Sequence, residues 1–102
     1  MARKVLKVLI ADDERIVREN MRQYIPWASM GMEVVDAVEN GALALDILKS
    51  VPVDIMLMDI RMPVMDGLEL LENIRALGLN VLVIVLSAYD QFEYAQKAIQ
   101  SR

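Results

Sequence analysis

Three short apolar runs, each followed by polar residues, are the strongest pattern along the chain. The runs are residues 5–11, 54–58 and 81–86, and the residues that follow them are Asp12 and Asp13, Asp59, and Ser87. Runs of this length, rich in Val, Ile, Leu and Met, are typical of strands buried on both faces of a parallel sheet. We therefore predict that all three are buried strands.

Segments with helical spacing alternate with these strands. Residues 14–25 carry an apolar stripe and stop at a proline, residues 32–38 form a further strand, and Asn40 is placed to cap the next helix. Two more helices follow, one that begins near Gly67 and stops at Gly78, and one after Asp90. The inward stripe of the first helix is predicted to be Val17, Met21, Tyr24 and Ile25. This β-α-β-α-β-α-β-α order predicts an α/β fold, an open and doubly wound parallel sheet with helices on both faces.

Size and composition limit the classes of protein that need to be considered. The 102 residues suffice for one domain. The longest apolar run has about six residues, whereas a membrane helix needs about 20, so no membrane association is expected. The basic start of the chain leads straight into a strand and then acids, which is not the pattern of a signal peptide. With no Cys as well, the sequence predicts a cytoplasmic location.

Charge and the absence of histidine narrow the chemistry. The net charge of −4 argues against direct binding of nucleic acid by this domain. No His is present, which excludes a His-dependent triad and a His-ligated metal site. Any phosphohistidine involved in the function must therefore belong to a partner.

The polar residues after the three runs form the candidate site. In open α/β sheets the functional crevice lies outside the carboxyl ends of the strands, so Asp12, Asp13, Asp59 and Ser87 are expected to converge. Clustered carboxylates suit Mg²⁺, and a carboxylate can also act as a nucleophile that forms an aspartyl phosphate. Ser87 is placed to donate a hydrogen bond to a phosphoryl oxygen. The simpler interpretation of Asp12 and Asp13 alone is helix capping.

As a set, the motifs resemble the receiver domain of two-component response regulators over essentially the whole chain. The matching segments are Asp12-Asp13-Glu14, Asn40-Gly41 with Ala44-Leu45, Asp59-Ile60-Arg61-Met62-Pro63, Met65-Asp66-Gly67 and Ser87-Ala88. The resemblance implies a flavodoxin-like fold in which Asp59 accepts a phosphoryl group from a sensor histidine kinase. It implies that Asp12, Asp13, Asp59 and the backbone carbonyl of Arg61 hold Mg²⁺, and that Ser87 is the switch hydroxyl. Regulation rather than enzymatic catalysis is the implied role.

Further residues resemble the subclass whose output is an AraC-type transcription module. These are Trp27, Tyr89, Phe92-Glu93-Tyr94-Ala95 and Ala98. The output domain itself is absent from this chain. Receivers have strand order 2-1-3-4-5, with a lysine on the fifth strand and then a fifth helix, and residues 1–102 do not include either element. The expected order here is 2-1-3-4, in a receiver domain incomplete at its C-terminal end. Residues 81–86 would then form a sheet edge through which the chain self-associates.

Three alternatives remain open from the sequence. A phosphatase with an aspartyl nucleophile would need an acid at Arg61, two positions after Asp59. A flavin- or nucleotide-binding module would need glycines in the first turn, where acids stand. A structural fragment or engineered truncation that folds without switching is compatible with the missing fifth strand.

Overall fold

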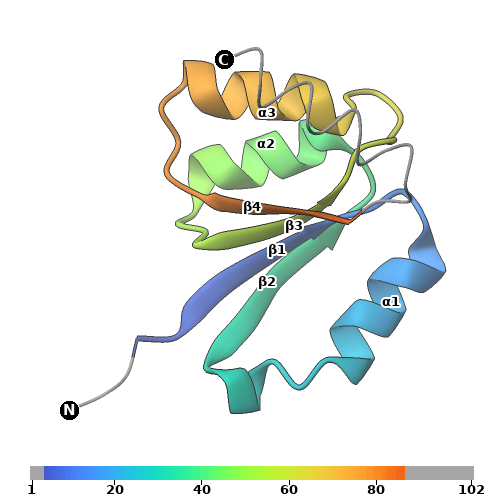
Figure 1. Ribbon diagram of the computed structural model, residues 1–102, viewed down its shortest axis with the longest axis vertical. Coiled ribbons are helices and arrows are strands. Elements are labelled where there is room, and N and C mark those ends of the chain that lie inside the picture. Colours follow the sequence, from blue (N-terminus) through green and yellow to red (C-terminus); the bar gives the residue numbers. More distant parts are fainter. Residues whose placement is uncertain (1–3, 87–102) are drawn as a thin grey trace.

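A four-stranded parallel sheet forms the centre of the molecule in the computed structural model, which describes residues 4–86. The strands are β1 (Leu6–Ala11), β2 (Met32–Val38), β3 (Ile55–Asp59) and β4 (Leu82–Leu86). Their spatial order is β2-β1-β3-β4, with every neighbouring pair parallel (Figure 1). The predicted α/β fold of the flavodoxin-like type and the order 2-1-3-4 are confirmed. Ser87 and the helix predicted after Asp90 lie outside the described residues.

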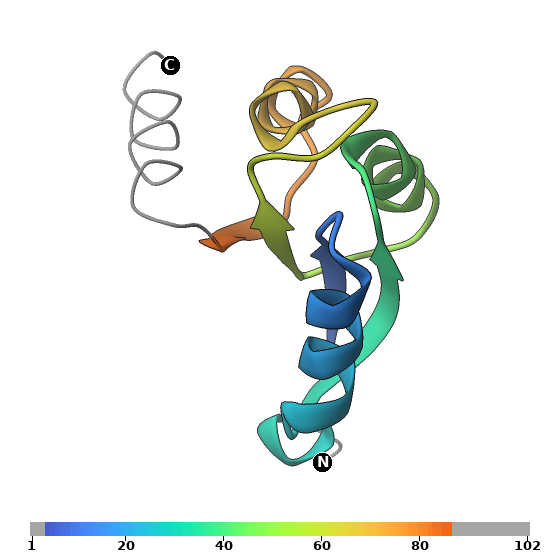
Figure 2. The same ribbon diagram turned by 90° about the vertical axis from the view of Figure 1, so that its right-hand side faces the viewer.

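Helices lie on both faces of the sheet. Helix α1 (Arg15–Tyr24) covers one face, while α2 (Gly41–Ser50) and α3 (Gly67–Ala76) lie side by side over the other (Figures 1 and 2). A short 3-10 helix, η1 (Ala28–Met30), lies in the segment predicted as a loop. None of the helices in the described part of the chain is long and apolar enough to cross a bilayer.

Local sequence signals explain where these helices begin and end. The side chain of Asn40 accepts a hydrogen bond from the backbone N–H of Leu43 at 2.8 Å, as its predicted role as N-cap requires. Asp66 caps α3 in the same way through Glu69. Gly78 follows α3 with a φ of +66°, and the N–H of Leu79 bonds the carbonyl of Ile74 at 3.0 Å. This closure is a Schellman motif, which confirms the predicted stop at Gly78.

The main core lies between the sheet and the α2–α3 layer. Leu9 and Met56 on the strands and Leu70 on α3 are fully buried there. Because successive strand residues point to opposite faces, Leu9 and Met56 face α2 and α3, while Val8 and Ile10 face the α1 side. The core thus holds β1 and β3 side by side, which brings the carboxyl ends of these two strands together.

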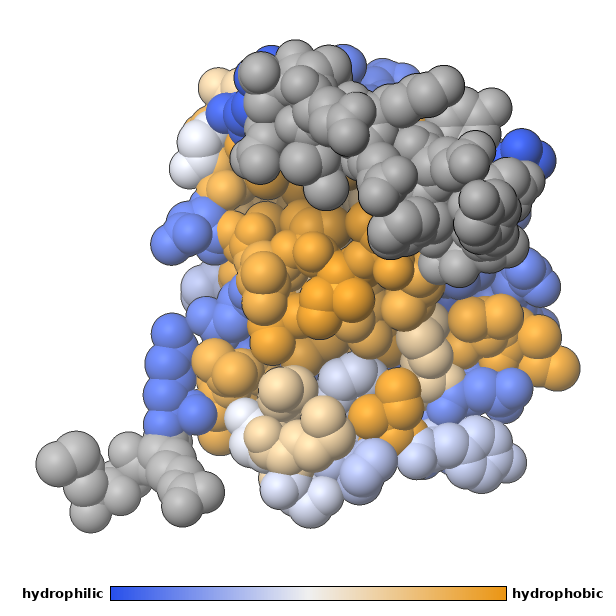
Figure 3. All heavy atoms as spheres, in the orientation of Figure 1, coloured by the Kyte–Doolittle hydropathy of each residue, from blue (hydrophilic) through white to orange (hydrophobic). Residues whose placement is uncertain are grey.

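The expectation that residues 81–86 form a buried strand is wrong for one of its faces. Val83 and Val85 pack against the core, but Leu82 is 61% exposed and Ile84 is 43% exposed. The exposed pair lies on the α1 side of the sheet, where α1 packs mainly against β2, at the opposite edge of the sheet from β4. In Figure 3 an apolar surface accordingly occupies the middle of the view. Among the described elements, no helix covers this part of the sheet.

The inward stripe predicted for α1 is also partly wrong. Val17, Met21 and Ile25 are half-buried as expected, but Tyr24 is 72% exposed. The helix ends at Tyr24, and the backbone of Ile25 is already extended before Pro26, so Tyr24 is the last residue of the helix. The indole N–H of Trp27 closes this end of α1 by donating to the carbonyl of Met21 at 2.9 Å.

Candidate functional site

The predicted acids lie at the carboxyl ends of the two central strands. Asp12 follows β1 and is 5% exposed, and Asp59 is the last residue of β3 and is 9% exposed. Asp13 is exposed. Each carboxylate is placed by its strand: β1 and β3 are paired as far as Ala11 and Met58, so the residues that follow emerge next to each other. The structure thus brings together three of the four side chains that the sequence selected.

Three acids of the β1–α1 turn form a compact group. Carboxylate oxygens of Asp12, Asp13 and Glu14 lie within 4.8 Å of one another. Asp59 is not a member of that group among the described residues. The sequence places Glu14 at the start of the first helix and does not indicate it as a potential ligand. In the structure Glu14 is the N-cap of α1 and makes no side-chain capping bond, so its carboxylate is left beside the other two.

Burial and mutual repulsion both disfavour charge on the inner two carboxylates. Burial is the largest cause that raises the pKa of Asp12, and the charge of Asp13 adds to it. Burial likewise raises the pKa of Asp59, with further contributions from the charges of Asp12 and Asp13. Hydrogen bonds from backbone N–H groups oppose the shift, from Glu14 at 2.8 Å for Asp12 and from Arg61 at 3.4 Å for Asp59. The site therefore holds more negative charge than its own donors offset.

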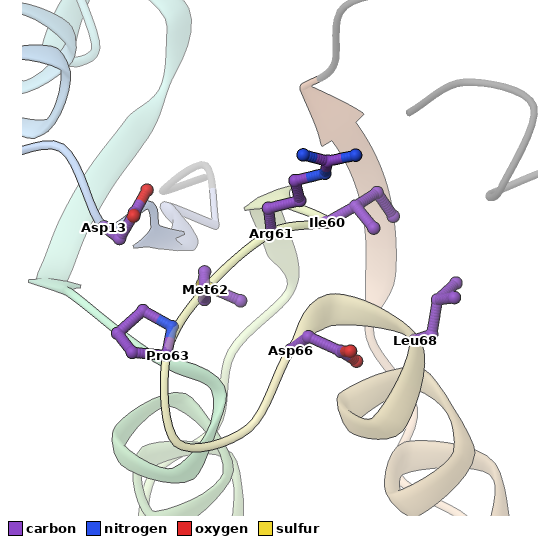
Figure 4. Close-up of a pocket in the computed structure, with 7 residues that line it drawn as sticks. All are labelled: Asp13, Ile60, Arg61, Met62, Pro63, Asp66 and Leu68. Carbon is purple, nitrogen blue, oxygen red and sulfur yellow. The ribbon is translucent and has the colours of Figure 1, made fainter. Parts of the chain in front are cut away.

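A hollow of about 540 Å³ opens beside Asp13 (Figure 4). It lies between Asp13 on the β1–α1 turn and the segment that links β3 to α3. The lining residues are Asp13, Ile60, Arg61, Met62, Pro63, Asp66 and Leu68. A small polar group can therefore approach Asp13 from solvent, whereas Asp12 and Asp59 do not line this hollow.

Two glycines hold the β3–α3 segment against the rest of the site. A Cβ on Gly67 would lie 2.8 Å from the carbonyl oxygen of Asp59, and one on Gly41 would lie 2.5 Å from that of Met65. Both glycines also donate backbone hydrogen bonds, Gly67 to Ile60 at 2.7 Å and Gly41 to Met65 at 2.8 Å. Gly67 therefore serves close approach of the backbone, for which a side chain would leave no room. These contacts fix the loop that carries Arg61.

Carboxylates around a hollow are a suitable ligand set for Mg²⁺. This cation prefers oxygen ligands, keeps several waters and is commonly held by one or two carboxylates. Burial first, and then repulsion between neighbouring carboxylates, raises the pKa values of Asp12 and Asp59, and a bound divalent cation would offset that repulsion. The backbone N–H of Arg61 points to Asp59, while its side chain is exposed. Ser87 lies outside the described residues, so its position in the site stays a prediction.

Comparison with known proteins gives a consistent picture. Residues 8–102 match the family model described as response regulator receiver domain. The transcriptional regulatory protein HptR of Staphylococcus aureus (strain N315) is 41% identical over 96 residues, which cover 94% of this chain and 37% of HptR. The chain thus spans little more than a third of the length of this curated relative.

Solved structures agree with the sequence relatives. The REC domain of AraT, a response regulator from Geobacillus stearothermophilus, is 46% identical with a TM-score of 0.83, over 96% of this chain and 76% of that one. A two component transcriptional regulator AraC from Clostridium phytofermentans ISDg is 37% identical with a TM-score of 0.83. That match covers 95% of this chain and 75% of the other. These relatives favour a regulatory domain over the phosphatase and the structural fragment considered from sequence.

Proposed function

The chain belongs to the response regulator receiver domain family, and we propose that Asp59 is the residue at which it accepts a phosphoryl group. The observation that carries this proposal is the position of Asp59 at the carboxyl end of β3, where it is nearly buried and within electrostatic range of Asp12 and Asp13. A carboxylate in that position can act as a nucleophile, and its neighbours can hold the cation that the reaction needs.

The proposed donor is the phosphohistidine of a sensor histidine kinase, as membership of the receiver family implies. This chain has no His that could supply the phosphohistidine itself. An oxygen of Asp59 forms a bond to phosphorus while the phosphorus–nitrogen bond breaks, and the leaving imidazole keeps the electron pair and takes up a proton. Asp13 and Asp59, Asp12 through water, and the carbonyl of Arg61 would hold Mg²⁺. The cation supplies neutralisation of the negative charge on the phosphoryl oxygens.

The proposed consequence is control of transcription through a partner domain of the AraC type. Support comes from the transcriptional regulators among the relatives, which are longer than this chain. Ser87 is proposed as the switch hydroxyl that responds to the phosphoryl group, biasing an existing equilibrium between two states. We include in the same proposal that residues 1–102 belong to one receiver domain and that it acts in the cytoplasm.

Treatment with a small acyl phosphate and Mg²⁺, followed by intact-mass measurement, tests the phosphoacceptor. The parent chain should gain one phosphoryl mass. Asp59→Asn should gain none. Asp66→Asn is the matched control because Asp66 lines the same hollow, and Asn serves as an N-cap as well as Asp does. It should react like the parent.

Retention of the mass gain by Asp59→Asn would reject this residue as the acceptor. If Asp66→Asn alone failed to gain the phosphoryl mass, the acceptor would be Asp66, at the start of α3. A parent that gains no mass with any acyl phosphate in Mg²⁺ would contradict the proposal as a whole.

We also propose that the chain pairs with a second copy of itself through residues 81–86. The edge of β4 opposite β3 has no strand beside it among the described residues. The adjoining sheet face exposes Leu82 and Ile84, and the run carries no charge and no proline to protect such an edge. An uncharged, β-branched edge is best matched by another of the same kind, which favours a two-fold contact between identical strands.

A further inference from the structure

Arg18 differs from the other arginines of α1 in the partner of its side chain. Its Nη1 donates to the backbone carbonyl of Asp12 at 2.7 Å, in a partly buried contact that reaches back one turn beyond the start of the helix. Arg15, by comparison, is exposed and pairs with Glu19 at 2.9 Å along the helix surface. Arg22 is exposed as well. The half-buried guanidinium of Arg18 is therefore directed at the β1–α1 turn.

This bond completes the fixation of Asp12. The N–H of Asp12 donates to the carbonyl of Val38 at 3.0 Å, and its Oδ1 accepts from the N–H of Glu14 at 2.8 Å. With the bond from Arg18, the backbone N–H, the side chain and the backbone carbonyl of Asp12 are all engaged. The carbonyl belongs to the peptide unit that carries the N–H of Asp13. Holding that peptide plane therefore limits the direction in which Asp13 leaves the turn.

The restricted peptide plane determines where the side chain of Asp13 can lie. It is exposed and lines the hollow beside the acids, where the proposed Mg²⁺ would bind (Figure 4). We infer that Arg18 is a positioning residue for this metal site, which presents Asp13 to the hollow by holding the carbonyl of Asp12. The inference rests on the proposed metal site and adds a residue outside the acidic motif.

Charge alone would give Arg18 the opposite effect. A guanidinium near a cation site repels the incoming Mg²⁺, so its removal should strengthen binding if electrostatics dominated. If its role is to position Asp13, its removal should weaken binding even though a positive charge is lost. Because the charge of Arg18 also lowers the pKa of Asp12, Mg²⁺ affinity is compared well above that pKa, where the direction of the change separates the two effects.

The experiment compares Arg18→Met, Arg18→Lys and Arg22→Met in the full chain, with Mg²⁺ affinity measured by calorimetric titration. Arg18→Met keeps the length of the side chain but removes the donor, and we expect it to weaken Mg²⁺ binding roughly tenfold, as is typical for a lost partner of a metal ligand. Arg18→Lys retains a donor and should recover most of the affinity. Arg22→Met, on an exposed part of the same helix, should bind like the parent.

Hydrogen exchange at the amide of Glu14 provides a readout that needs no metal. That amide donates to Asp12, so it should exchange faster in Arg18→Met and not in Arg22→Met. Melting temperatures measured without Mg²⁺ show whether a variant has lost stability. If Arg18→Met is unstable, the Mg²⁺ affinity of Arg18→Lys is compared with that of the parent instead.

Unchanged or tighter Mg²⁺ binding in Arg18→Met would overturn the role of Arg18 and leave the metal site intact. A parent chain that binds no Mg²⁺ would overturn the proposed metal site, and the role of Arg18 with it.

Discussion

At the scale of single residues, Asp59 carries a conflict between function and stability. Its pKa is raised in the folded chain, chiefly by burial and next by the charge of Asp12. A carboxyl group whose pKa is raised by folding favours the folded state less once it ionises. The resulting loss of stability is absent at a pH below 3.8, the usual pKa of the group, and is complete at a pH above its pKa in the folded state.

Asp59→Asn should therefore melt a few degrees above the parent at neutral pH in metal-free buffer, because it removes a buried charge beside two others. The difference should shrink as the pH falls toward 3.8. Mg²⁺ at millimolar concentration should raise the melting temperature of the parent by mass action and leave that of Asp59→Asn nearly unchanged. Thermal melts at several pH values check both effects, and an equal response of the two proteins to Mg²⁺ would count against the site.

Val64 stores strain in the loop beside the site. Its φ is +69°, a left-handed conformation that costs a residue with a side chain about 1–2 kcal/mol. The N–H of Met65 bonds the carbonyl of Pro63 at 2.7 Å, so Val64 is the central residue of a tight γ-turn. Val64 is 81% exposed, so no lost packing complicates a substitution.

Val64→Gly should stabilise the fold by roughly 0.5–1 kcal/mol, after allowance for the greater freedom of glycine in the unfolded chain. Val51→Gly is the matched control, because Val51 is also exposed but has a φ of −134° that suits any residue. The control should lose roughly 0.5–1 kcal/mol. Urea unfolding measures both, and a loss of stability in Val64→Gly as large as in the control would show that the turn is not strained.

Single residues with a local signal could be predicted from the sequence, and residues placed by tertiary contacts could not. Short-range rules predict that Asn40 caps the start of one helix and that Gly78 ends another, and both predictions are confirmed. Nothing in the sequence around Val64 indicates a positive φ, because a β-branched residue disfavours it. Glu14 was overlooked for a similar reason: an acid in the first turn is ordinary, and only the folded turn shows it beside Asp12 and Asp13.

At the scale of elements, Asp54 joins three strands at the end of the sheet opposite the site. Its Oδ2 accepts from the N–H of Lys7 at 2.8 Å, its Oδ1 pairs with Lys4 at 3.1 Å, and its carbonyl accepts from the N–H of Leu82 at 3.0 Å. Asp54 directly precedes β3 and therefore connects that strand to the starts of β1 and β4. The hydrogen bond from Lys7 is the largest cause that lowers the pKa of Asp54, followed by the bond from Lys4.

A carboxyl group with a lowered pKa contributes stability that is present above its usual value of 3.8 and is lost as the pH falls through the folded pKa. Asp54→Asn should consequently be less stable than the parent at neutral pH, and this difference should close in acid below 3.8. Lys4→Gln leaves the hydrogen bond from the Lys7 amide to Asp54 in place, so it should lose less stability at neutral pH than Asp54→Asn. Urea titrations at pH 7 and at pH 3 test this, and a gap that stays constant with pH would exclude a role for the charge.

The order and type of the described elements followed from the hydrophobic pattern, and errors arose where burial depended on a neighbouring element. The run that became β1 is buried on both faces at Val8, Leu9, Ile10 and Ala11, whereas β3 is buried at Met56 and Met58 on the side of α2 and α3 and only half-buried at Ile55 and Leu57. The run of β4 has the same composition, yet Leu82 and Ile84 are exposed because no described helix covers them. An apolar run predicts that a segment is a strand but does not identify what covers it.

At the scale of the whole molecule, the site is assembled by topology. Asp12 and Asp59 are far apart in sequence and meet because β1 and β3 are neighbours in a parallel sheet. The sequence could predict this convergence since all parallel strands end on the same side. It could not predict the side-chain geometry within the turn, including the contact of Arg18, which depends on how α1 leaves the sheet.

The exposed face of β4 leads to a prediction about association. The sequence alone suggests a lysine at position 83 or 85 as the disruptive change, but Val83 and Val85 pack against the core, so a charge there would damage the fold. Ile84 is 43% exposed and lies on the free face, where a lysine can extend into solvent in the monomer. Ile84→Lys is therefore the variant that alters the proposed contact and leaves the core intact.

The parent chain should sediment as a dimer or larger species at high concentration, and Ile84→Lys should remain a monomer, since pairing through a two-fold axis would bring two lysines together. Leu43→Lys is the control, because Leu43 is similarly exposed, at 42%, but lies on α2, on the other side of the sheet. It should associate like the parent. A parent that stays monomeric at every concentration, or an Ile84→Lys variant that associates as strongly as the parent, would refute pairing through β4. Association lost equally in both variants would instead point to a contact that involves α2.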